Sequence, residues 1–129
     1  MKPQNIFDIC HERYRGMREC PAEKLRAVNL DQPSIGYQWH PEKTRAAEYL
    51  VDFEKAGRRV LARPQWSGRL RLFQVYFLRG VSYRCAISLV GVPEGTFDWW
   101  TQEVKKAVGR ELERSGLYPP SQYFKPGKT

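Results

Sequence analysis

Residues 80–111 read GVSYRCAISLVGVPEGTFDWWTQEVKKAVGRE, and their spacing decides the expected fold. Ser82 is a good N-cap for a helix over residues 83–90, and Gly91 suits the left-handed backbone of a tight turn. A longer helix is expected from about residue 93 to residue 115. This arrangement predicts a helix-turn-helix, a unit whose second helix can enter a DNA groove. The apolar side chains expected to face inward across the turn are Ala86, Val90, Val92, Phe97 and Trp100.

Helix-forming patterns also occupy most of the chain upstream of this motif. Pro41 is expected to open a long helix with an apolar stripe, because proline suits a first turn, and Arg63-Pro64 ends it. The helix that follows is expected to stop at Gly80. The helices expected before the motif cover residues 3–16, 21–28, 41–62 and 66–78.

Proline and glycine mark the segments that are not expected to be helical. Residues 29–41 contain both and are interpreted as a loop or linker. The tail, GLYPPSQYFKPGKT, is too rich in them for regular structure, although its aromatic side chains could fold back onto the core. The sequence therefore predicts an all-α fold in three parts: an N-terminal helical segment and linker (1–40), a helix-turn-helix domain (41–115) and an irregular tail (116–129).

The chain is basic, with 22 Lys and Arg against 14 Asp and Glu and a formal charge of +8. Residues 55–93 contain Lys and Arg but no Asp or Glu. A cationic segment beside a groove-binding motif favours a nucleic-acid partner, since guanidinium groups can hold phosphates by paired hydrogen bonds. The competing interpretation is a solvated face. The arginines expected to contact the DNA backbone are Arg69, Arg71, Arg79 and Arg84.

Composition and spacing argue against several other classes of protein. Three cysteines at irregular spacing fit a reducing compartment, and no apolar run approaches the roughly 20 residues that span a bilayer. Cys10, His11, Cys20 and His40 match no compact zinc spacing, and neither a nucleophile elbow nor a glycine-rich phosphate loop is present. We therefore expect a cytoplasmic protein of bacterial or phage type that is not an enzyme and needs no metal or cofactor.

The string GVSYRCAISLVGVPEGTF, residues 80–97, resembles region four of sigma-70-type transcription factors, their C-terminal DNA-binding region. That region typically reads G-x-S-Y-x-E-I-A-x-x-L-G-I-P-E-G-T-V, and LRLFQVYFLRG upstream resembles the helix that precedes it. The resemblance covers roughly residues 58–112 and implies binding of double-stranded DNA, transcription regulation and contact with RNA polymerase. The matching positions are Gly80, Ser82, Tyr83, Gly91, Val92, Pro93, Glu94, Gly95 and Thr96.

The chain departs from this pattern at several positions. Cys85 replaces a usual acidic residue, and Ile87 stands where a small alanine is usual. Asp98, Trp99 and Trp100 occupy positions where the family prefers basic and small polar residues. No counterpart of the promoter-melting domain is expected. The resemblance therefore implies a sigma-like DNA-binding module, as in small phage regulators, rather than a complete sigma factor.

The outward face of the second helix is the candidate recognition surface. Gln102 can hydrogen-bond adenine through its amide, but Glu94, Asp98 and Glu103 place negative charges near phosphates. The alternative is a protein-interaction module, in which Trp99 and the acidic side chains of this helix dock a partner. The candidate DNA-binding residues of the helix are Glu94, Gly95, Thr96, Asp98, Trp99, Gln102, Lys105 and Lys106.

Overall fold

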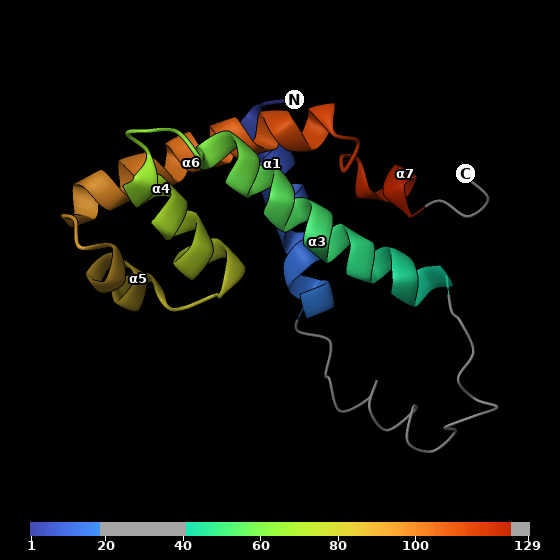
Figure 1. Ribbon diagram of the computed structural model, residues 1–129, viewed down its shortest axis with the longest axis horizontal. Helices are drawn as coiled ribbons and strands as arrows, with labels where there is room; N and C mark the ends of the chain where they lie inside the picture. Colours follow the sequence, from blue (N-terminus) through green and yellow to red (C-terminus); the bar gives the residue numbers. More distant parts are fainter. Residues whose placement is uncertain (19–40, 125–129) are drawn as a thin grey trace, which may run out of the picture.

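The computed structural model describes residues 1–18 and 41–124, and all regular structure in these two ranges is helical (Figure 1). The all-α prediction is confirmed for this part of the chain. The expected helix over residues 21–28 and the loop over residues 29–40 lie outside it. No helix in the described ranges is long and apolar enough to cross a membrane. The elements are α1 (Pro3–Arg18), α3 (Pro41–Leu61), α4 (Ser67–Leu72), the π-helix η1 (Phe73–Leu78), α5 (Tyr83–Val90), α6 (Glu94–Arg114) and α7 (Pro120–Tyr123).

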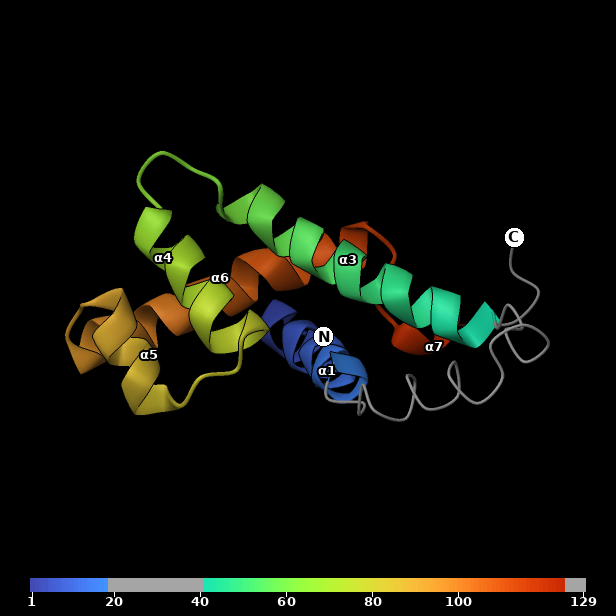
Figure 2. The same ribbon diagram turned by 60° about the horizontal axis from the view of Figure 1, so that its bottom comes forward.

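Helix α6 runs along most of the fold, and α1 and α3 both pack on it (Figures 1 and 2). Helix α1 is its most extensive partner. The two backbones approach closely at Gly109, where an added Cβ would collide with the carbonyl oxygen of Pro3. The buried carboxylate of Glu111 accepts a 2.6 Å hydrogen bond from Arg59 and so links the C-terminal half of α6 to α3. Its hydrogen bonds with Arg114, Ser115 and Arg59 lower the pKa of Glu111.

Aromatic rings fill the core between α1, α3 and η1. The rings of Tyr14 and Phe53 stack at 4.6 Å between centroids, and the ring of Phe7 meets Phe77 edge-on at 4.8 Å. The three-to-four spacing of residues 3–16 predicts that Ile9 shares one face with Ile6 and Cys10, but the Ile9 side chain is 39% exposed, so this prediction is wrong. Compared with the predicted face, the buried face of α1 is rotated so that it includes the aromatic residues Phe7 and Tyr14. Its buried residues are Ile6, Phe7, Cys10 and Tyr14.

The single helix expected over residues 66–78 consists of α4 followed by the π-helix η1. The wider turn is visible where the Arg79 amide donates to the carbonyl of Gln74, five residues earlier, at 3.0 Å. A π-helical turn contains more residues than an α-helical turn, so it changes which side chains share a face. In η1 four of the six side chains are buried. Gly80, with φ of 75°, ends the helix as expected. The buried residues of η1 are Phe73, Val75, Phe77 and Leu78.

The C-terminal tail packs back onto α3. Tyr123 and Phe124 place their ring centroids 5.0 and 5.2 Å from the ring of buried Tyr49. The Tyr123 hydroxyl donates to Asp52 at 2.8 Å. The sequence predicted that these aromatic residues could return to the core, but it also predicted no regular structure here, and the single helical turn α7 corrects that expectation.

Candidate nucleic-acid interface

Helices α5 and α6 meet at a short connection built as the sequence indicated. The Ser82 hydroxyl accepts a hydrogen bond from the Cys85 amide at 3.3 Å and caps α5. Gly91 ends that helix with φ of 78° and ψ of 35°, a left-handed conformation that costs glycine little. Helix α6 then begins directly after Pro93. Across the connection Ala86 and Phe97 are fully buried, while Val90, Val92 and Trp100 are partly buried against the same core.

Tyr83 joins the start of α5 to the first turns of α6. Its ring meets the buried ring of Phe97 edge-on, with 5.5 Å between centroids. Its hydroxyl donates to Asp98 Oδ1 at 2.5 Å and lies 3.3 Å from Glu94 Oε2. The hydrogen bond to Asp98 is the main cause of a raised pKa at Tyr83. These two carboxylates therefore support the α5–α6 packing, and they lie at a helix N-terminus, where negative charge is favourable.

The outer face of the early turns of α6 is exposed to solvent. Trp99 is the most prominent side chain on it, with 59% of its surface exposed. Thr96 is half-buried and is less accessible than the other candidates. The remaining predicted contact residues that lie on this exposed face are Glu94, Gly95, Asp98, Gln102 and Lys106.

Two charged residues assigned to this outward face of α6 are instead turned toward other helices. Lys105 is only 22% exposed and forms a 3.1 Å ion pair with Asp8 of α1. Glu103 faces α4, where it pairs with Arg69. Helical spacing does not show that α1 and α4 lie against α6 on either side. The assignment of Lys105 and Glu103 to the outward face of α6 is therefore wrong.

Arg69 is held inside a cluster of tryptophans. Its Nε donates to Glu103 Oε1 at 2.6 Å, and its side chain is only 13% exposed. Its guanidinium lies 4.6 and 4.9 Å from the ring centroids of Trp66 and Trp100, and 5.7 Å from that of Trp99. Its guanidinium is paired and largely shielded from solvent, so Arg69 is less accessible to DNA phosphates than the sequence indicated.

The other three predicted arginines, Arg71, Arg79 and Arg84, are exposed. Arg71 donates through Nε to the Leu89 carbonyl at the end of α5, at 2.9 Å. Arg71 and Arg79 also line a hollow of about 390 Å³, which we call the arginine groove. Sequence spacing could not place Arg18 or Arg58 beside them, because this requires the crossing of α1 and α3. The groove is lined by Arg18, Glu54, Arg58, Arg71, Gln74, Val75, Leu78 and Arg79.

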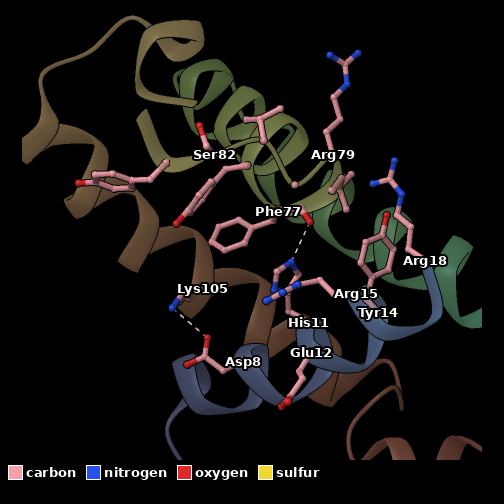
Figure 3. Close-up of a pocket in the computed structure, with 15 residues that line it drawn as sticks. Asp8, His11, Glu12, Tyr14, Arg15, Arg18, Phe77, Arg79, Ser82 and Lys105 are labelled. Carbon is pink, nitrogen blue, oxygen red and sulfur yellow. Dashed lines mark hydrogen bonds and ion pairs between the residues drawn. The ribbon is translucent and has the colours of Figure 1, made fainter. Parts of the chain in front are cut away.

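A larger cleft of about 820 Å³ lies between α1 and the connection from η1 to α5 (Figure 3). Arg18 and Arg79 lie toward one end of it, and the Asp8–Lys105 ion pair lies toward the other. At its wall His11 Nε2 is 2.9 Å from the Phe77 carbonyl, so the ring N–H donates there. Burial lowers the pKa of His11, which favours the neutral imidazole. The imidazole therefore fastens α1 to η1.

Comparison with family models, with curated proteins and with solved structures gives no match to this chain. Among the described residues, no group of three or more His, Cys, Asp or Glu side chains is placed to hold a metal ion. The exposed face of α6, the arginine groove and the adjoining cleft are the candidate partner surfaces considered below.

Proposed function

We propose that the protein binds double-stranded DNA in a sequence-specific manner as a transcription regulator, using α5 and α6 as a helix-turn-helix. The observation that carries this proposal is the packing of the two helices about Gly91, which leaves the first turns of α6 exposed. The resemblance of residues 80–97 to sigma region four supports the same use of these helices. In this proposal α6 enters the major groove and the exposed arginines contact the backbone.

The charges around α6 oppose DNA contact less in the folded protein than a count of its acidic residues suggests. Three carboxylates would repel phosphate if all of them faced outward. Glu103 is neutralised by Arg69, so Glu94 and Asp98 are the two carboxylates that remain exposed on these turns. Gln102 remains exposed on the same helix with Lys106 one turn further along. A side-chain amide at this place can donate to and accept from adenine.

Exposed Trp99 favours a second candidate function, the docking of a protein partner. Tryptophan is enriched among the residues that dominate the binding energy of protein interfaces. Arg69 lies beneath the ring at 5.7 Å and helps to fix its position. RNA polymerase is the partner that the sigma-like resemblance implies, and both functions can operate in one protein.

The first test of DNA recognition is Gln102→Ala. Selection of bound duplexes from a random pool is expected to return a preferred sequence for the unmodified protein. The variant should lose the preference at one base pair, at a cost of about 1–3 kcal/mol there, because one paired amide contact is removed. Affinity for unselected duplexes should change little. Gln122→Ala on α7 is the matched control, since Gln122 is also exposed but lies away from α6.

Selection that returns no preferred sequence, together with unchanged behaviour of Gln102→Ala, would contradict base recognition by α6. The protein-docking function would then be the better account of the exposed helix.

The docking function is tested by Trp99→Ala. Capture of purified RNA polymerase by the immobilised protein should fall by about tenfold or more, because truncating a central aromatic contact typically costs at least about 2 kcal/mol. Val51→Ala is the control, since Val51 is also exposed (53%) but lies on α3. Retained capture by Trp99→Ala would exclude this face as the polymerase contact. A parallel loss of duplex affinity would assign Trp99 to DNA instead.

A further inference from the structure

The arginine groove brings Arg18 together with three arginines of the cationic segment. Arg18 comes from α1, Arg58 from α3, Arg71 from α4, and Arg79 follows η1. Glu54 is the single carboxylate of its lining. Like charges gathered in one hollow repel each other, so the folded chain carries an electrostatic cost that a bound anion would relieve.

The one carboxylate in the groove cannot balance these charges. Glu54 accepts a 2.7 Å hydrogen bond from the Tyr14 hydroxyl and forms a 3.4 Å ion pair with Arg58. Among the described residues, Arg18 and Arg79 form no ion pair. Arg71 uses only one of its five N–H donors in its hydrogen bond to Leu89. Within the part of the chain that the structure describes, most of the donors in this groove therefore have no acceptor.

The groove and the larger cleft adjoin each other. Arg18, Leu78 and Arg79 line both hollows, so the cationic surface continues from α3 and α4 past the end of α1. Figure 3 shows Arg18 and Arg79 beside each other on the cleft side. Arg15 also lines the cleft side. The arginines that line this continuous surface come from three segments of the chain: α1, α3 and the α4–η1 helix with the residue that follows it. A polymer of phosphates can meet them in turn, and guanidinium groups match phosphate oxygens through paired hydrogen bonds.

We infer that the arginine groove, extended past Arg18 and Arg79 into the cleft, is a second DNA-binding surface that holds the phosphodiester backbone. Resting on the proposed function, this inference adds α1 and α3 to the DNA footprint. Arg79 is followed within three residues by Ser82, the cap of α5, so a strand held at Arg79 passes close to the start of the proposed helix-turn-helix. The groove contacts are independent of sequence, whereas α6 contacts bases.

The test compares two paired variants, Arg18→Gln/Arg79→Gln and Arg58→Gln/Arg71→Gln, with a matched control, Lys2→Gln/Arg13→Gln. The control removes the same charge from exposed side chains outside the groove, the cleft and α6. Binding to a duplex long enough to extend beyond α6 is measured by fluorescence anisotropy over a series of salt concentrations. Each paired groove variant should lower the slope of log affinity against log salt by about two units, while the control keeps the slope of the unmodified protein.

Base preference separates this inference from the proposed function. If α6 specifies sequence, the groove variants should select the same base pairs as the unmodified protein. Unchanged slopes in both groove variants would overturn the groove inference and leave the function of α6 standing. Loss of the preference at one base pair in Gln102→Ala, together with lowered salt slopes in the groove variants, would support base recognition by α6 and backbone binding by the groove.

A small phosphate compound could occupy the arginine groove in place of the DNA backbone, because it offers the same phosphate oxygens to the guanidinium groups. Inorganic phosphate and a nucleoside monophosphate are titrated while thermal unfolding is followed by circular dichroism. Saturable stabilisation that Arg18→Gln/Arg79→Gln abolishes, with an unchanged DNA slope, would identify a small-anion site and overturn the inference of a DNA backbone surface. The same melting curves show whether each variant is folded, so that a lost slope is not mistaken for lost structure.

Discussion

Phe97→Ala is expected to lower the free energy of unfolding by about 3–5 kcal/mol. The Phe97 ring is fully buried, and it meets the rings of Tyr76 and Tyr83 edge-on with centroids at 5.4 and 5.5 Å. Removing it leaves a cavity at the point where η1, α5 and α6 share one core. Urea denaturation followed by circular dichroism measures the change as a shift of the midpoint.

Trp99→Ala is the matched control for this substitution, because Trp99 also lies in the early turns of α6 but is exposed. Its midpoint should move far less. Equal shifts in the two variants would contradict the packing of α5 and α6 around Phe97, and with it the structural basis of the proposed helix-turn-helix.

Arg69→Ala is expected to destabilise the fold by about 2–3 kcal/mol, because it leaves the carboxylate of half-buried Glu103 without its cation and removes contacts with tryptophan rings. Arg69→Lys should recover only part of this, since an ammonium lacks the planar fork of donors. Denaturation midpoints of the single variants and of Arg69→Ala/Glu103→Ala complete a double-mutant cycle.

The cycle also distinguishes the two roles that have been assigned to Arg69. A structural pair predicts that the double variant loses clearly less stability than the two single variants added together. Strict additivity, combined with a salt slope lowered by about one unit in Arg69→Ala, would instead return Arg69 to the DNA backbone.

Local signals were sufficient to predict the helices around the motif. Ser82 as an N-cap and Gly91 as a left-handed C-cap act within a few residues, and the structure has both where the sequence indicates. The π-helical turns of η1 were not predictable, because they depend on which residues of the helix must be buried against α1 and α3. The apolar face of α1 was misplaced at Ile9 for the same reason.

The candidate site was less predictable than the fold, because charge counts along a chain do not reveal partners across it. Arg69 and Glu103 are far apart in sequence but neutralise each other at 2.6 Å. Lys105 likewise finds Asp8 on the first helix. Conversely, Arg18 stood outside the cationic segment of the sequence, yet it lines the groove with Arg71 and Arg79.

The close approach of α1 to α6 at Gly109 has a consequence for how the chain is made. Helix α1 is synthesised well before α6, yet its most extensive packing is against α6. Until α6 emerges, α1 lacks the helix with which it makes most of its contacts. Closing so long a loop slows folding and lengthens the time during which apolar surface is exposed to aggregation. The nascent chain is therefore expected to depend on chaperones that shield α1 until α6 has been synthesised.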